Sequence, residues 1–195
     1  MKKFIVLLLA ALMIVGLCVS CKENLPVAPE EIVEDVVEGT IDTFGLFGEP
    51  VYALASGHYT PEETKTHLDP YLKNNLEYYW ECDDVTVESV ITENSIYADI
   101  LGDSNVNELK VETSNLEYHD DPKYSVSGSF TIYAKGREEG ASVSFDVKGT
   151  FEISTYVPGT SSITFTSVKY RGTEYDLAAF NEAMKEALKD WPSVT

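Results

Sequence analysis

Residues 124–153 read YSVSGSFTIYAKGREEGASVSFDVKGTFEI, and this stretch decides the fold. Apolar residues alternate with polar ones over 124–134 and again over 141–153, on either side of a glycine-bounded segment, 136–140. Alternation with a period of two places every second side chain on the same face of a strand. Two such runs around a short loop predict a β-hairpin with an apolar inner face and an outer face rich in serine and threonine.

Gly128 and Gly149 interrupt the apolar face of this hairpin. If residues 137–140 form the loop, the register pairs the two glycines with each other, and the two missing side chains leave a hollow. We expect either a closely packed helix or a small ligand to occupy that hollow. A structure with Phe180 or Met184 seated there would exclude the ligand.

Strand patterns also cover four further segments, 85–91, 95–101, 107–118 and 162–171. In the last of them the apolar phase slips between Phe165 and Val168, which predicts a β-bulge. Together with the hairpin, these segments predict an antiparallel β-meander of about five to six strands.

Helical periodicity precedes the strands. Pro29 suits the first position of a helix, and the acidic residues that follow it suit the positive end of the helix dipole. Apolar residues then recur at helical spacing from Ile32 to Phe44. Gly45 and Gly48 are expected to end this first helix.

Two further helices have sequence signals at their ends. Thr60-Pro61-Glu62-Glu63 has the pattern of a capping box, and Asp69-Pro70 predicts a fresh start within the second helix. The last helix is expected to begin after Asp176 and to end at Pro192. Its apolar stripe is formed by Leu177, Phe180, Met184, Leu188 and Trp191.

The order of these elements predicts an α+β fold for residues 29–195, read as a single domain. N-terminal helices precede the meander, and the C-terminal amphipathic helix follows it. A helix with one apolar stripe must bury that stripe, and the inner face of the sheet offers the apolar surface. We therefore expect the C-terminal helix to pack on one face of the sheet.

Residues 1–20 read as a signal peptide. Lys2 and Lys3 form a short positive region, and no charged residue occurs between Phe4 and Val19. This apolar run is on the short side of the roughly 20 residues that cross a bilayer. A positive start followed by such a run is typical of an export signal.

The end of the run, Cys18-Val19-Ser20-Cys21, resembles the lipobox of bacterial lipoproteins. Ser20 takes the small position before the cleaved bond, while Cys18 stands where leucine is usual. The resemblance covers residues 1–21 and implies cleavage between Ser20 and Cys21 and acylation of Cys21. Two or more acyl chains hold a protein firmly on a membrane. An uncleaved membrane anchor and an ordinary secretory signal are the alternatives.

Residues 21–28 are then the lipidated cysteine and a short tether. Lys22-Glu23-Asn24 resembles the surface-export signal of Bacteroidetes lipoproteins, in which a lysine is followed by acidic residues, although Glu23 is the single acidic residue here. An ordinary solvated tether is an equal alternative. The expected location is the cell envelope, with lipid on Cys21 in the outer membrane, facing either the periplasm or the cell surface.

Charge narrows the classes of partner. The chain has a formal net charge of −19 at pH 7, and cleavage would remove Lys2 and Lys3 but no acidic residue. Nucleic acid is disfavoured, because a phosphate backbone requires concentrated lysine and arginine. Cationic ligands or basic partner surfaces fit better, although high acidity also serves solubility alone.

Cleavage would also remove Cys18, and acylation would occupy Cys21, which leaves Cys82 as the remaining thiol. An internal disulfide is therefore not expected in the mature chain. Cys82 has no identifiable paired base, and we expect it to be buried rather than reactive.

The sequence predicts no metal and no cofactor. His58 and His67 do not have the spacing of zinc ligands. His119-Asp120-Asp121-Pro122 reads as a turn between strands, and a metal site there is the alternative. Residues 103–107 begin like a calcium loop, but Glu108 stands where that loop needs glycine. The chain contains no phosphate-binding loop, dinucleotide fingerprint or nucleophile elbow.

Tyr78, Tyr79 and Trp80 are the candidate ligand-binding residues. They could form a stacking platform for a carbohydrate, and the hydroxyl-rich outer face of the sheet could hydrogen-bond one. The alternative is that the aromatic residues belong to the helix core and that the outer face is simply solvated, as antiparallel sheets often are.

Three functional hypotheses remain. The first is a non-enzymatic, lipid-anchored envelope lipoprotein that binds a protein or carbohydrate ligand or has a structural role. The second is a small envelope hydrolase using acidic residues, which would place them with His119 in one concave pocket. The third is a partner-binding inhibitor or chaperone-like lipoprotein, which would show an exposed apolar patch or an open sheet edge.

Overall fold

The computed structural model describes residues 25–79, 84–103, 105–120, 123–138, 141–154 and 160–191. The helices are α2 (Glu30–Ala55), α3 (Pro61–Tyr79) and α4 (Ala178–Ala187), and a short 3-10 helix, η1 (Leu188–Asp190), follows α4. The strands are β1 (Val85–Thr92), β2 (Ser95–Gly102), β3 (Val106–His119), β4 (Ser125–Glu138), β5 (Ala141–Ser154), β6 (Ser162–Tyr170) and β7 (Thr173–Glu174).

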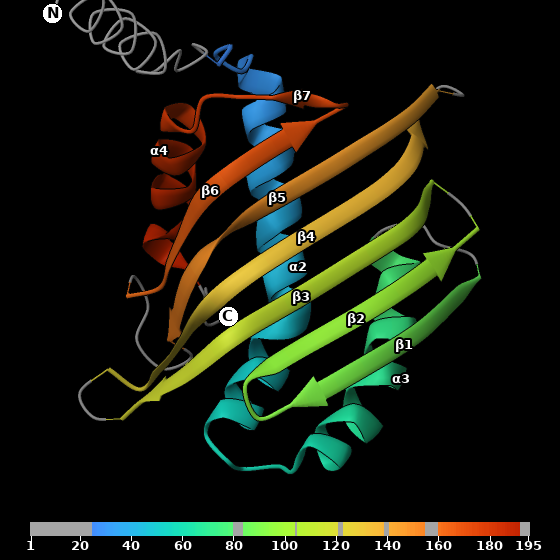
Figure 1. Ribbon diagram of the computed structural model, residues 1–195, viewed down its shortest axis with the longest axis vertical. Helices are drawn as coiled ribbons and strands as arrows, with labels where there is room; N and C mark the ends of the chain where they lie inside the picture. Colours follow the sequence, from blue (N-terminus) through green and yellow to red (C-terminus); the bar gives the residue numbers. More distant parts are fainter. Residues whose placement is uncertain are drawn as a thin grey trace, which may run out of the picture.

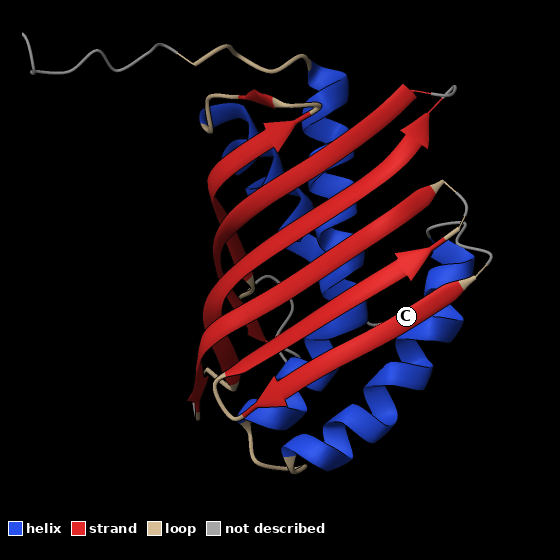
Figure 2. Ribbon diagram, turned by 45° about the vertical axis from the view of Figure 1, so that its right-hand side comes forward, coloured by secondary structure: helices blue, strands red, loops and turns tan. Residues whose placement is uncertain are grey.

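The seven strands form one antiparallel sheet in which spatial order follows sequence order, β1 to β7. The α+β class and the meander are confirmed, and the two-residue β7 is added beyond the last predicted strand. Figure 1 shows α2 crossing behind the middle of the sheet, α3 behind β1 and β2, and α4 beside β6. The helices cover one face, and the other face is open in Figure 2.

The core lies between this helical layer and the inner face of the sheet. Phe180 and Met184 of α4 are fully buried, which confirms that the C-terminal helix packs on the sheet. The hydroxyls of Thr40 and Thr43, two buried polar residues of α2, donate to Val36 O and Gly39 O, each at 2.7 Å. Hydrogen bonds to the preceding turn satisfy both threonines, so burial leaves neither hydroxyl unpaired.

The prediction that Gly45 and Gly48 end the first helix is wrong. α2 continues through both glycines and through Pro50 to Ala55, a total of 26 residues. Each glycine costs about 1 kcal/mol and the proline about 3 kcal/mol of helix propensity. Burial of Phe47 and of the apolar residues after Pro50 against the sheet outweighs that cost, since each contributes roughly 1.5–3 kcal/mol.

The second helix begins as the capping box predicts. The carboxylate of Glu63 accepts a hydrogen bond from the Thr60 backbone N–H at 2.8 Å, and the Glu63 N–H donates to the Thr60 hydroxyl at 3.3 Å. The predicted fresh start at Asp69-Pro70 is wrong, because α3 runs through Pro70 without a break.

The hairpin is confirmed, but its register differs from the expected one. Glu138 pairs with Ala141, so the connection is two residues shorter than a loop over 137–140 would be. Gly128 therefore lies opposite Phe151, and Gly149 lies opposite Phe130. The expected glycine pair does not form.

The hollow predicted beside those glycines is filled. The Phe44 ring of α2 lies 5.1 Å from the rings of both Phe130 and Phe151. The space left around Phe44 and Phe130 is about 10 Å³, which is too small for a ligand. Close helix packing is therefore the use of these glycines, and the helix is α2 rather than α4.

The predicted bulge is confirmed in β6. Lys148 pairs with Ser167 and the next residue, Gly149, pairs with Phe165, so Thr166 is the extra residue. The side chain of Asn181 in α4 accepts a hydrogen bond from Phe165 N–H at 2.8 Å and donates one to Phe165 O at 3.2 Å. The helix thus satisfies both backbone polar groups of the strand beside the bulge.

Candidate functional site

Several candidate residues from the sequence lie outside what the structure describes. Ser20 and Cys21, the residues at the proposed cleavage and lipidation site, are among them, as are Trp80 and Cys82. The backbone of Tyr78 and Tyr79 ends α3, but their side chains are outside the described part. The stacking platform therefore stays a prediction.

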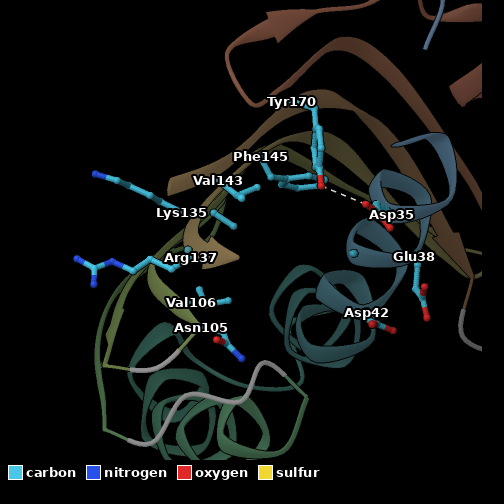
Figure 3. Close-up of a pocket in the computed structure, with 13 residues that line it drawn as sticks. Asp35, Glu38, Asp42, Asn105, Val106, Lys135, Arg137, Val143, Phe145 and Tyr170 are labelled. Carbon is cyan, nitrogen blue, oxygen red and sulfur yellow. Dashed lines mark hydrogen bonds between the residues drawn. The ribbon is translucent and has the colours of Figure 1, made fainter. Parts of the chain in front are cut away.

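A pocket of about 380 Å³ opens between α2 and the ends of four strands, on the inner face of the sheet. Figure 3 shows its walls, with the helix on one side and β3 to β6 curving around the other. We call it the α2 groove. Pockets of about 300–1,000 Å³ are the size that holds small organic ligands. Its lining residues are Asp35, Glu38, Gly39, Asp42, Asn105, Val106, Ala134, Lys135, Gly136, Arg137, Val143, Phe145 and Tyr170.

The sheet contributes an apolar floor to the α2 groove. Val106, Val143 and Phe145 are at least partly buried and line it from β3 and β5. Gly136 lies at the end of the floor, where the backbones of β4 and of the residues before β3 approach each other closely. A Cβ on Gly136 would lie 2.2 Å from Asn105 O. This close approach lets Arg137 N–H donate to Asn105 O at 2.8 Å. Glycine is thus required where the start of β3 meets the end of β4.

The helix contributes an acidic wall. Asp35, Glu38 and Asp42 are three and four residues apart, which places them on one face of α2. Gly39, between them, has no side chain to fill the groove. Partial burial, and to a smaller extent the charge of Glu38, raises the pKa of Asp42 above its ordinary value. Concentrated negative charge of this kind would be relieved by a bound cation.

One member of the acidic wall is tied to the floor. The hydroxyl of Tyr170 in β6 donates to the Asp35 carboxylate at 3.1 Å, the contact drawn in Figure 3. Burial and this hydrogen bond raise the pKa of Tyr170, so the phenol stays protonated and remains a donor. The Arg171 guanidinium lies 5.4 Å from the centre of the Tyr170 ring. Tyr170 therefore links β6 to α2 at the end of the groove where Asp35 lies.

The two basic residues that line the groove do not neutralise its acidic wall. Lys135 and Arg137 extend away from the cavity in Figure 3, on the opposite side from α2. No salt bridge to Asp35, Glu38 or Asp42 is found within the described residues. The wall therefore keeps its negative potential toward the cavity.

A second polar cluster lies on the outer face of the sheet, at the other end of β3 and β4. Nε2 of His119 is 2.7 Å from Ser127 Oγ. The Ser125 hydroxyl donates to Glu152 at 2.8 Å, and Lys123 Nζ lies 3.0 Å from the same carboxylate. Hydrogen bonds from Lys123 and Ser125 lower the pKa of Glu152. His119 is thus separated by the sheet from the acidic wall.

The described part of the chain shows neither a metal-binding cluster nor a membrane-spanning helix. It holds no group of three or more histidine, cysteine, aspartate or glutamate side chains that could bind a metal ion. None of its helices combines the length and apolar character needed to cross a membrane.

Comparison with known proteins identifies no relative. No protein-family model, no curated protein and no solved structure matches the chain significantly. The site must therefore be interpreted from its own chemistry.

Sequence reasoning did not find the α2 groove. The spacing of Asp35, Glu38 and Asp42 was a usable signal, because three carboxylates on one helix face at the helix N-terminal half suggest more than dipole compensation. The floor had no comparable signal. In the sequence, Val143 and Phe145 are simply inward-facing residues of a strand. The angle at which the helix packs on the sheet decides which strand ends it leaves uncovered, and the sequence does not report that angle.

Proposed function

We propose that the protein is a non-enzymatic, lipid-anchored bacterial envelope lipoprotein whose folded part binds a ligand in the α2 groove. The ligand class is an organic cation that carries an apolar body. An alkylamine is one example, and a basic peptide with an apolar side is another. The single observation that carries this proposal is the union of an apolar floor and a carboxylate wall in one open pocket of about 380 Å³.

The two surfaces of the groove act on different parts of such a ligand. The apolar body would cover Val106, Val143 and Phe145 and remove their exposed surface from water, which contributes about 25 cal/mol per Å². The positive charge would face Glu38 and Asp42, whose mutual repulsion it relieves. The net charge of −19 favours the approach of cations and raises their association rate.

The hydrolase hypothesis has less support. It needs acidic residues and His119 together in one concave pocket, whereas the acidic wall and His119 lie on opposite faces and at opposite ends of β3. The inhibitor or chaperone-like hypothesis needs an exposed apolar patch or an open sheet edge. At the β1 edge, Lys65 already donates to Ser89 O at 2.7 Å, which blocks one of the backbone groups that a partner strand would use.

The anchor is tested by metabolic labelling with a fatty-acid analogue in a bacterial host. The intact chain should incorporate the label, and Cys21→Ala should not. The matched control is Cys18→Ala, which leaves the acylated thiol in place and should keep the label. Labelling of Cys21→Ala, or a leader still present on the native protein, would contradict the anchor without bearing on the groove.

The groove is tested by calorimetric titration of the purified protein with octylamine, 1-octanol and methylammonium. Octylamine should bind most tightly, because it alone has both the charge and the apolar body. The double variant Glu38→Gln/Asp42→Asn should weaken octylamine binding by about tenfold, since each exposed charge contributes roughly 0.5–1 kcal/mol.

A matched double variant on the same helix controls for net charge. Glu31→Gln/Glu34→Gln removes two exposed carboxylates outside the groove and should leave the affinity nearly unchanged. Equal weakening by both double variants would mean a general electrostatic effect. Binding of 1-octanol as tight as that of octylamine would also contradict the proposal, because the acidic wall would then contribute nothing.

A further inference from the structure

A second pocket lies between residues of α2, of the loop that follows it and of α3. The end of α2 and the start of α3 lie at the lower edge of the molecule in Figure 1. Its volume is about 250 Å³. Its lining consists of Glu49, Pro50 and Ala53 from α2, Tyr59 from the connecting loop, and Thr64, His67, Leu68 and Tyr71 from α3. We call it the interhelix pocket. It shares no residue with the α2 groove, so it is a separate site.

Three rings line the interhelix pocket. The rings of Tyr59 and His67 lie 5.7 Å apart and are tilted by 53°, so they do not stack flat on each other. Tyr59 is 48% exposed and Tyr71 is 41% exposed, which makes them two of the largest aromatic surfaces left in water by the described part of the chain. Two of the three rings therefore present surface to solvent at the rim of the cavity.

Local structure holds these rings in place. Tyr59 precedes the capping box of Thr60 and Glu63, which fixes the chain where it enters α3. His67 and Tyr71 are four residues apart on α3 and therefore project from the same face of the helix. The hydrogen bonds that start α3 thus fix the backbone next to Tyr59, and the helix fixes the spacing of His67 and Tyr71.

We propose that the interhelix pocket binds a quaternary ammonium group. A trimethylammonium group cannot donate a hydrogen bond, and it is recognised by the negative faces of aromatic rings, most strongly when several rings surround it. Glu49 supplies the negative charge at the rim. The Thr64 hydroxyl already donates to Thr60 O at 3.0 Å, so it is not a free donor for a hydroxyl-rich ligand.

The position of the pocket favours a free solute over a lipid head group. α2 has 26 residues, so its two ends are about 39 Å apart at 1.5 Å per residue. The interhelix pocket lies at the C-terminal end, whereas the proposed lipid anchor precedes the N-terminal end. A pocket a full helix length from the anchored end would meet small solutes more readily than the head groups of its own membrane.

The test is calorimetric titration of the purified protein with choline and with 3,3-dimethylbutanol, the uncharged isostere of choline. Choline should bind at least tenfold more tightly, because only the cation is attracted by the rings and by Glu49. Tyr59→Leu and Tyr71→Leu should each weaken choline binding by about tenfold. Tyr71→Phe should retain most of the affinity, because the ring face remains.

Two controls make the result specific. Tyr133→Leu changes a tyrosine on the outer face of the sheet and should leave choline binding unchanged. Because Tyr59 and Tyr71 are exposed, their leucine variants should unfold at nearly the wild-type urea concentration, so that a loss of binding reports on the pocket. Loss of affinity in Tyr71→Phe, or tighter binding of glucose than of choline, would point to hydrogen-bonded sugar recognition and overturn the proposal.

The source of the ammonium group is tested separately with glycerophosphocholine. Its phosphate would lie near Glu49, so choline should bind more tightly if the natural ligand is a free solute. Tighter binding of glycerophosphocholine would assign the same ammonium site to a lipid head group. Equal affinity for choline and 3,3-dimethylbutanol would contradict both assignments. None of these outcomes depends on the α2 groove.

Discussion

Phe130 and Gly149 are cross-strand partners in the β4–β5 ladder, and the phenylalanine ring occupies the space above the glycine. A Cβ built on Gly149 would lie 2.6 Å from Cε1 of Phe130 and 2.3 Å from Thr164 O. Phe44 of α2 then packs edge-on against the Phe130 ring. The glycine thus creates the space in which Phe130 of the neighbouring strand β4 meets the helix.

Gly149→Ala is therefore expected to destabilise the protein. The added methyl group meets a backbone oxygen that cannot rotate away, and overpacking of a core commonly costs about 1–3 kcal/mol. We expect a loss of about 3 kcal/mol in the free energy of unfolding, measured by urea denaturation. A loss below about 0.5 kcal/mol would show that the sheet adjusts freely at this position.

The same substitution at another glycine supplies the control. Gly45 is an exposed residue within α2, and a Cβ there would have no neighbour within 4 Å. Since alanine has a higher helix propensity than glycine, Gly45→Ala should stabilise the protein by up to about 1 kcal/mol. Opposite signs for the two glycine variants would confirm that local space, and not residue type, decides the effect.

The register of this hairpin marks the limit of what alternation predicts. A shift of two residues returns every side chain to the same face, so a period-two pattern fixes the face but not the partner. The sequence therefore predicted that Gly128 and Gly149 face the core and gave them the wrong partners. In the observed register a phenylalanine lies opposite each glycine, and the rings of both phenylalanines pack against Phe44 of a distant helix.

The long first helix shows how burial overrides a local signal. Gly45, Gly48 and Pro50 are helix breakers by propensity, yet the helix continues because Phe47 and Val51 are almost completely buried. Helix propensity is a weak prior wherever a tertiary contact is available. Apart from the unbroken course of α3 through Pro70 and the two-residue β7, the other helices and strands were predictable, because their apolar periods are long and regular.

The candidate sites were less predictable, because each joins segments that are far apart in the sequence. Asp35 and Tyr170 meet across 135 positions to fix the end of the α2 groove. The interhelix pocket needs Glu49 and Tyr71 on two different helices. No pattern within one segment reports such a meeting.

Asn181→Ala is expected to loosen α4 from the sheet. Its amide holds both backbone groups of Phe165, a residue that is 2% exposed, so the substitution leaves a buried N–H and C=O without this partner. Each buried unsatisfied group costs about 1–3 kcal/mol, and we expect a loss of about 3 kcal/mol in total. Hydrogen exchange should show faster exchange of the Phe165 amide.

Glu182→Ala is the control on the same helix, because Glu182 is exposed and its removal should change stability by less than about 0.5 kcal/mol. Asn181→Asp distinguishes the two hydrogen bonds. The carboxylate can still accept from Phe165 N–H, but it repels Phe165 O. If Asn181→Asp is as stable as the wild type, the bond to the carbonyl has no structural role.

Glu152 should make stability depend on pH. Its pKa is lowered by the hydrogen bonds from Lys123 and Ser125, so the folded state favours the ionised carboxylate. This contribution is fully present above the ordinary pKa of about 4.5 and is lost as the pH falls through the lowered folded value. Lys123→Met should raise the pKa of Glu152, measured by NMR titration of its side-chain carboxyl carbon.

The same variant should reduce the difference between the unfolding free energies at pH 6 and pH 3. The reason is that the pKa of Glu152 in the folded state then lies closer to its pKa in the unfolded state. The pair is partly exposed, so we expect an effect below about 1 kcal/mol. Lys185→Met, on α4, serves as the control and should leave the titration of Glu152 unchanged. An unchanged titration in Lys123→Met would contradict the assigned cause of the shift.

Lys65→Met is expected to weaken the attachment of α3 to the β1 edge. Nζ of Lys65 donates to Ser89 O at 2.7 Å and to Asp69 at 2.9 Å, and the Ser89 hydroxyl donates to the same carboxylate. Methionine keeps the apolar stem but removes both donors. We expect a loss of about 1 kcal/mol in the free energy of unfolding. Hydrogen exchange in β1 should become faster, and self-association at high concentration should increase, because an unblocked edge strand can pair with another chain.

Lys73→Met removes an exposed lysine from the same helix and should change none of these measurements. Equal hydrogen exchange of β1 in the two variants would mean that Lys65 does not protect this edge.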